Sequence, residues 1–164
     1  MFSGQEEYFQ KLLVLVKKEI GLYTKYAVRL KENGGIRHIY NTKLFRDELS
    51  NVMEDAFTHM DRRSYGMERE ALFGEWQKFH DEAYRTMKEG GVFLAFEYML
   101  RRLGFNAFQQ YIACLAMAPE LNREFERMYS FLQDDLAWRY PSLDLCIKMY
   151  TMDEQEQNTL IHQT

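Results

Sequence analysis

The sequence predicts an all-α fold. Over most of its 164 residues, apolar side chains recur at every third or fourth position, which places them on one face of a helix. Strand-like alternation of apolar and polar residues is scarce, and the two prolines both lie after residue 118. The apolar share of 46% is ample for a packed core, and this length suits one domain or one domain with a small appendage.

Three long helices are predicted in the first half, over residues 5–32, 42–61 and 67–88. The first ends at Asn33-Gly34-Gly35, because glycine adopts the left-handed C-cap conformation without strain. A turn over residues 62–66 separates the second helix from the third. Gly90-Gly91 marks the preferred boundary between two parts of the chain. We therefore expect a helical bundle in residues 1–90 and a compact helical module in residues 91–164, or one continuous domain of both parts.

Shorter helices are predicted in the second half. Residues 92–103 form one, and Asn106 caps the next, which is nearly all apolar. Pro119 suits the first turn of a further helix, where its missing N–H is not needed. Ser142 caps the last clear helix, and Asp153-Glu154 marks the start of another near the end of the chain.

The first helix carries two apolar strips, so it is either sandwiched between other helices or paired with another chain. We expect Phe9, Leu15, Leu22 and Tyr26 to leave apolar area exposed as a surface for a protein partner. The 10 methionines and the many aromatic residues are compatible with such a surface and equally with a core.

A specific pattern of helix starts, turns and caps occupies residues 103–150. Its parts are Leu103-Gly104 with Phe108, Ala118-Pro119-Glu120-Leu121, Leu132-Gln133-Asp134-Asp135 and Pro141-Ser142-Leu143-Asp144-Leu145. The pattern resembles the helical, winged-helix-like domain that precedes the ATPase module in a group of bacterial AAA+ ATPases, some of them encoded with contractile injection systems. The resemblance covers roughly the last third of the chain. Ser142 stands where that family usually has threonine, and both residues cap helices.

The resemblance implies a non-catalytic N-terminal domain that recruits a substrate or adaptor, or packs on the ATPase ring, in the cytoplasm. The expected partners are proteins, and further copies of the chain through the ring of the parent ATPase. ATP and Mg²⁺ are implied for the parent alone, because the chain has no GxxxxGK[ST] sequence to bind phosphates. We accordingly expect no enzymatic activity and no catalytic, cofactor or metal site in this chain.

The sequence gives little indication of a metal site, a disulfide, a signal peptide or a membrane span. Asp55 and His59 have the i,i+4 spacing of a two-residue metal site, but a hydrogen-bonded surface pair is favoured. Cys114 and Cys146 lie far apart in apolar runs, which predicts two buried, reduced thiols of the kind found in the cytosol. The N-terminus lacks the basic start of a signal peptide, and the longest dense apolar run, residues 12–16, is too short to span a membrane.

Charge argues against nucleic acid as the partner. Residues 92–152 hold six basic and seven acidic side chains, whereas a surface that binds phosphates gathers positive charge. Arg101, Arg102 and Arg139 form a candidate basic spot, although a solvated face is favoured. The alternative function is a winged-helix nucleic-acid-binding regulator with a helical dimerisation arm, which rests on fold analogy alone.

Overall fold

A computed structural model describes residues 1–33 and 61–163 of the protein. Within these ranges the chain forms seven α-helices and no β-strand, which confirms the predicted all-α fold. The helices are α1 (Gln5–Asn33), α3 (Arg62–Glu89), α4 (Ala95–Arg102), α5 (Ala107–Leu121), α6 (Glu124–Gln133), α7 (Leu143–Tyr150) and α8 (Glu154–Gln163). The helix predicted over residues 42–61 falls outside the described ranges, apart from Asp61.

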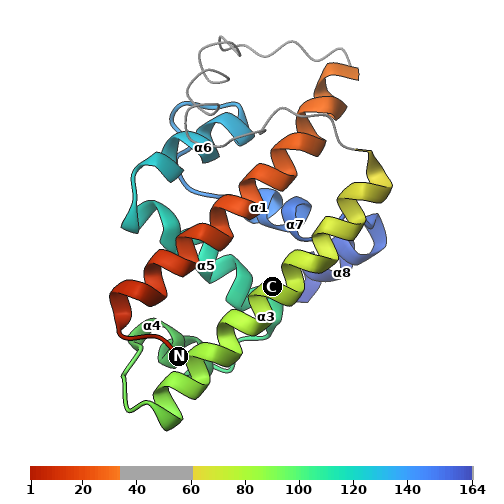
Figure 1. The fold of residues 1–164 in the computed structure, drawn as a ribbon. Coiled ribbons are helices and arrows are strands. Elements are labelled where there is room, and N and C mark those ends of the chain that lie inside the picture. The colour runs from red at the N-terminus through yellow and green to blue at the C-terminus, as the bar shows by residue number, and fades with distance from the viewer. Residues whose placement is uncertain (34–60, 164) are drawn as a thin grey trace.

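The two long helices α1 and α3 lie side by side and run in opposite directions (Figure 1). The shorter helices α5 and α7 pack against α1, while α4 lies at the end of α3 near the N-terminus (Figure 1). Buried side chains from helices on both sides of Gly90-Gly91 belong to one hydrophobic core. The predicted boundary thus falls between helices that share their core.

The start of α3 differs from the sequence prediction. Residues 62–66, expected to be a turn, form the first turn of this helix. The side chain of Asp61 accepts a hydrogen bond of 2.7 Å from the Ser64 amide, which caps the helix. Tyr65 is fully buried in the core, so the apolar face of α3 begins earlier than residue 67.

Pro119 also lies elsewhere than predicted, because it is inside α5 and does not open the next helix. A proline within a helix leaves the carbonyl four residues earlier, here that of Leu115, without its amide donor. The buried hydroxyl of Tyr129 on α6 donates to this carbonyl at 2.7 Å. The tertiary contact therefore satisfies the group that the proline leaves unpaired, and α5 continues to Leu121.

Two predicted helix starts are confirmed. Asn106 and Gln109 form a capping box at the start of α5, in which each side chain bonds the backbone of the other. The Ser142 hydroxyl accepts from the Leu145 amide at 3.1 Å and caps α7. Asp134 ends α6 in the left-handed conformation, with φ 55°.

No described helix is long and apolar enough to cross a membrane.

The hydrogen bond from Tyr129 to the Leu115 carbonyl should contribute more to stability when residue 119 is proline. We expect Tyr129→Phe to lower the free energy of unfolding by about 1–3 kcal/mol, because a buried carbonyl loses the hydroxyl that donates to it. In a Pro119→Ala background the amide of residue 119 supplies a donor, so Tyr129→Phe should cost less there. Urea denaturation of the four proteins of this double-mutant cycle measures the difference. Equal costs in both backgrounds would contradict this account of how α5 accommodates its proline.

Candidate binding site

A buried ion pair joins the central helices. The carboxylate of Glu19 on α1 is fully buried and accepts two hydrogen bonds from the guanidinium of Arg69 on α3. It also accepts from Trp76 Nε1 at 2.8 Å and from the Tyr111 hydroxyl at 2.9 Å. Arg69 in turn donates to the Met149 carbonyl of α7 at 2.9 Å. One carboxylate and one guanidinium thus connect α1, α3, α5 and α7.

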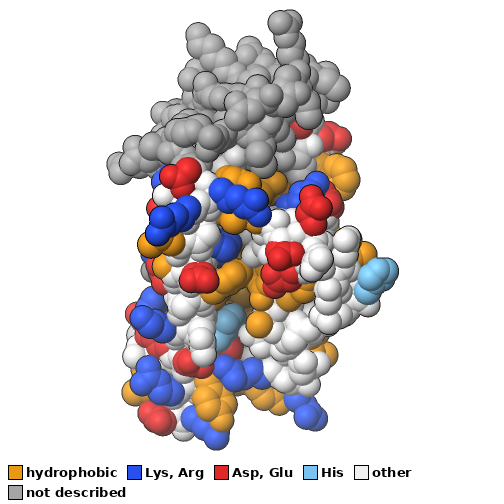
Figure 2. All heavy atoms as spheres, turned by 90° about the vertical axis from the view of Figure 1, so that its right-hand side faces the viewer, with side chains coloured by type: hydrophobic (Ala, Val, Ile, Leu, Met, Phe, Trp, Pro, Cys, Tyr) orange, Lys and Arg blue, Asp and Glu red, His pale blue; other side chains and the backbone are white. Residues whose placement is uncertain are grey.

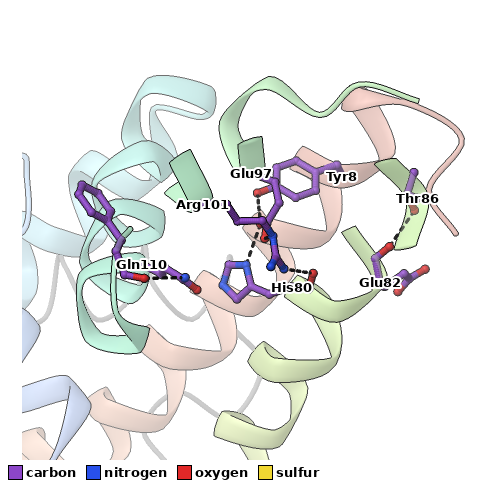
Figure 3. A network of polar contacts seen from close by, with 8 residues as sticks. Tyr8, His80, Glu82, Thr86, Glu97, Arg101 and Gln110 are labelled. Atoms are coloured by element: carbon purple, nitrogen blue, oxygen red, sulfur yellow. Dashed lines mark hydrogen bonds and ion pairs between the residues drawn. The ribbon is translucent and has the colours of Figure 1, made fainter. Parts of the chain in front are cut away.

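A second buried carboxylate, that of Glu97 on α4, organises the neighbouring region (Figure 3). Oε2 of Glu97 lies 2.8 Å from His80 Nδ1 and accepts from the Tyr8 hydroxyl at 3.1 Å. Oε1 accepts from Arg101 Nε at 3.0 Å, and a terminal nitrogen of Arg101 donates to the His80 carbonyl at 2.9 Å. Burial beside Glu97 raises the pKa of Tyr8 far above its usual value, so its hydroxyl remains a donor.

An open hollow lies between these two networks, and we call it the aromatic pocket. Its volume is about 430 Å³. Aromatic rings from three helices form its walls, with Trp76 and Tyr111 held by Glu19 and His80 held by Glu97. The lining residues are Phe73, Trp76, Gln77, His80, Asp81, Arg101, Ala107, Gln110, Tyr111 and Tyr150. Figure 2 shows hydrophobic side chains at the bottom of the hollow on this side of the molecule.

His80 presents one ring nitrogen to the aromatic pocket. The Glu97 carboxylate already accepts from Arg101 and Tyr8, which indicates that it is ionised and that His80 Nδ1 carries the proton shared with it. In the neutral imidazole Nε2 is then a hydrogen-bond acceptor. Figure 3 shows this nitrogen pointing away from Glu97, and among the described residues it has no hydrogen-bond partner. The pocket thus offers one oriented acceptor within aromatic walls.

A second hollow, which we call the cationic pocket, adjoins the first because both include Arg101 in their lining. Its volume is about 390 Å³, and its lining residues are Tyr84, Met87, Lys88, Tyr98, Arg101 and Arg102. The cations of Lys88 and Arg101 lie 4.9 and 4.5 Å from the centre of the Tyr84 ring. Figure 2 shows Lys and Arg side chains together with hydrophobic ones at this lower end of the molecule.

Helix α4 buries one face and exposes apolar side chains, beside Arg101 and Arg102, on the other. Its inner face packs Leu94, Phe96 and Leu100 into the core. Its outer face and flanks expose Phe93 (60%), Tyr98 (49%), Met99 (42%) and Leu103 (59%), and the rings of Phe93 and Tyr98 contact each other with centroids 5.3 Å apart. Contiguous exposed apolar side chains of this kind are typical of an interaction surface.

A third hollow, of about 570 Å³, lies between α1 and α3. Leu22 and Leu72 form part of its floor, and lysines from α1 face glutamates from α3 across it. Lys18 and Glu75 pair at 2.7 Å. This pair is exposed, and Lys17, Lys25 and Glu68 also line the hollow.

The structure corrects the predicted partner surface on the first helix. Leu15 and Leu22 are each only 5% exposed and belong to the core, because α3 covers one strip of α1 while α5 and α7 cover another. Phe9 is partly buried against Phe96. Tyr26 is partly buried and stacks on Tyr65, with ring centroids 4.6 Å apart. The two apolar strips of α1 are thus sandwiched, and exposed apolar side chains lie on other parts of the described chain, α4 and its flanks among them.

The predicted basic spot is only partly assembled. Arg101 and Arg102 both line the cationic pocket. Arg139 follows α6, which lies at the opposite end of the molecule from α4 (Figure 1), and its guanidinium is 4.0 Å from the Glu126 carboxylate. Asp55 and His59, which have the spacing of a two-residue metal site, both lie outside the described ranges. Among the described residues no cluster of three potential metal ligands is present.

Sequence reasoning missed both carboxylate networks. Glu97 bonds residues 17 and 89 positions away, and Glu19 bonds residues 50 to 92 positions away. One signal was present, since Glu19 and Arg69 each interrupt the apolar stripe of an amphipathic helix. Buried charges of this kind require a partner, but the sequence does not show which.

The two cysteines are buried free thiols, as predicted. Burial raises the pKa of Cys146 to about 12 and that of Cys114 well above its usual value. Both side chains pack in the same core as the central helices. The reactivity of these two thiols therefore measures how tightly that core is packed.

Together, the fold and the two networks define a small helical domain built around buried charged groups. The chain belongs to the family described as "Winged helix domain, variant", whose model matches residues 7–160. This finding confirms the winged-helix part of the resemblance, and the match extends across Gly90-Gly91. No curated protein and no solved structure matches the chain.

Substitutions of Glu19 and Arg69 should have strongly non-additive effects on the free energy of unfolding. Glu19→Gln leaves Arg69 as an uncompensated buried charge, and Arg69→Met does the same to Glu19. We expect each change to lower the free energy of unfolding by about 3–5 kcal/mol. The double variant removes both charges, while the amide introduced by Glu19→Gln can accept from Trp76 through its oxygen and donate to the Tyr111 hydroxyl through its NH2, so it should be no less stable than the weaker single variant. Guanidinium denaturation tests this, and strictly additive losses would contradict it.

The burial of the thiols predicts that they resist modification. Because the thiolate is the reactive form, we expect neither Cys114 nor Cys146 to react with Ellman's reagent in the folded protein at pH 8. Both should react at once in 6 M guanidinium, a concentration of the order that unfolds even very stable domains. The absorbance of the released nitrothiobenzoate measures the reaction. Rapid stoichiometric labelling without denaturant would show that the core opens readily around α5 and α7.

Proposed function

We propose that the chain is a non-catalytic protein-interaction domain. Specifically, it serves as the N-terminal domain of an AAA+ ATPase and recruits a substrate or adaptor, or packs on the ATPase ring, in the cytoplasm. The pattern in residues 103–150 supports the ATPase assignment, and the winged-helix family agrees with it. ATP and Mg²⁺ then belong to a following module of the parent protein, through whose ring several copies of this domain assemble.

The outer face of α4 carries the proposal. A helix of a monomeric domain normally exposes polar side chains on its solvent side, whereas α4 and its flanks expose Phe93, Tyr98, Met99 and Leu103 beside Arg101 and Arg102. The polar groups of the interior are used for structure, since Glu19 and Glu97 each accept from several donors within the chain. The domain thus presents an apolar surface on a firmly held helix.

A nucleic-acid-binding regulator is the second candidate. The cationic pocket favours it, because aromatic rings beside Lys and Arg also bind single-stranded nucleic acid. The net charge of −4 opposes it. Titration of a single-stranded oligonucleotide at two salt concentrations separates the candidates, since binding through phosphates weakens steeply with salt.

The ATPase assignment is tested by the coding sequence downstream of Thr164. An open frame that encodes GxxxxGK[ST] and a later acidic Walker B strand supports the assignment. A stop codon directly after Thr164 contradicts it, and leaves the protein-interaction proposal to be tested by itself.

The interaction surface predicts a site-specific partner contact. A photo-crosslinking amino acid placed at Tyr98 in the cell should yield one discrete protein adduct, because that ring lies on the exposed apolar face of α4. Adding Phe93→Ser should reduce the adduct about tenfold, since exposed apolar side chains at the centre of an interface carry much of its affinity. Gel analysis and mass spectrometry measure the adduct.

The matched control is Met67→Ser together with the same crosslinker at Tyr98. Met67 is a similarly exposed apolar residue, but it lies at the other end of α3. This variant should leave the adduct unchanged. An adduct that resists Phe93→Ser, or that is lost equally with Met67→Ser, would contradict a partner surface on α4.

A further inference from the structure

The aromatic and cationic pockets lie next to each other along α3, with Arg101 between them, and we call the two together the α3 groove. Both pockets include Arg101, and their α3 residues follow a single face of that helix at spacings of three or four. These residues are Phe73, Trp76, Gln77, His80, Asp81, Tyr84, Met87 and Lys88. At 1.5 Å per helical residue the stripe is about 22 Å long. This length matches about six or seven residues of an extended peptide.

One end of the groove suits an aromatic side chain that donates a hydrogen bond. The walls are the rings of Trp76, Tyr111 and Tyr150, and Trp76 and Tyr111 already contact edge-to-face with centroids 6.1 Å apart. A further ring entering there has faces and edges to pack against. The acceptor Nε2 of His80, oriented by Glu97, lies on the same wall. A tyrosine hydroxyl or a tryptophan indole N–H complements this acceptor.

The other end of the groove suits acidic side chains. Lys88 and Arg102 line it, and neither forms an ion pair with a carboxylate of the part of the chain that the structure describes. Arg101 is half-exposed and is held in place by Glu97 and by the His80 carbonyl. Arginine and lysine beside aromatic rings bind carboxylates while the rings exclude water.

We propose that the α3 groove binds a short acidic segment of a partner protein that inserts a tyrosine or tryptophan beside His80 and places glutamate or aspartate beside Lys88 and Arg102. This inference rests on the proposed protein-interaction function and specifies the chemistry of the partner. The groove is preformed, because Glu19 and Glu97 fix its walls before any ligand arrives. Binding then requires little ordering of the protein.

A peptide fits the groove better than a nucleic acid does. A nucleic-acid strand brings a phosphate at every step, and such binders provide many cations along their path. Here Lys88 and Arg102 lie at one end, Arg101 is shared by both pockets, and Asp81 lines the aromatic end. A segment with its negative charge on one side of an aromatic anchor matches this uneven distribution.

The test uses the whole chain and a defined probe. The probe is a fluorescein-labelled peptide with one tyrosine followed by glutamates and aspartates, and its anisotropy measures binding. We expect Lys88→Glu with Arg102→Glu to weaken binding about tenfold, because two attractive contacts become repulsive. Lys78→Glu reverses an exposed charge on α3 that lines neither pocket, and it should leave binding unchanged.

The aromatic end has its own pair of variants. Ala107→Phe fills the mouth of the aromatic pocket from the exposed first residue of α5, and should weaken binding about tenfold or more. Ala116→Phe adds the same ring at an exposed position of α5 outside the pocket, and should have no effect. Replacing the tyrosine of the peptide by phenylalanine should weaken binding about fivefold, through loss of the hydrogen bond to His80. Circular dichroism verifies that each variant is folded.

Two results would overturn the inference. One is peptide binding that is absent, or that responds equally to the groove variants and to their controls. The other is an oligothymidylate that binds more tightly than the peptide and competes with it, which would assign the groove to nucleic acid. If the peptide fails while the crosslink at Tyr98 persists and depends on Phe93, the groove inference is wrong and the protein-interaction function stands.

Discussion

The buried pair of Glu19 and Arg69 is the constraint on which the rest of the structure depends. An ionised carboxylate without contact with water is tolerated only when its charge and its lone pairs are matched. Glu19 meets this requirement through donors from α3 and α5, and Arg69 reaches on to α7. Apolar contacts tolerate small shifts between helices, whereas these hydrogen bonds are directional. The pair therefore fixes how far α1 and α3 slide along each other and where α5 and α7 dock.

The same constraint shapes the surface. Trp76 and Tyr111 are held by Glu19 from inside, and their rings form the wall of the α3 groove on the outside. Glu97 acts similarly in the neighbouring region, since it anchors α4 from within and sets the direction of His80 and Arg101. Carboxylates in the interior thus decide the shape of the groove and the orientation of its polar groups. Helix α4 connects this interior to the exposed apolar face that we propose as the interaction surface.

Local chemistry allowed much of the fold to be predicted. The apolar stripes predicted α1 and most of α3, because a helical period of 3.6 residues can be recognised within one segment. The caps at Asn106 and Ser142 were predicted because the side chain that caps a helix lies within three residues of the amide it bonds. Pro119 misled the prediction, since the donor that rescues its helix comes from Tyr129, on another helix.

By itself, the sequence determined the helical class, the polar or apolar face of each helix and most of their ends, because these depend on residues a few positions apart. Only the tertiary structure decided that Leu15 and Leu22 are covered, since exposure depends on which helices pack against α1. It alone brought Glu19 to its partners and brought His80 and Tyr8 to Glu97, because a side chain separated from its partner by 17 to 92 positions leaves no local trace of the contact. Arg101, which also bonds Glu97, lies four positions away on the same helix. The groove and its oriented histidine exist for the same reason, as products of packing between distant segments.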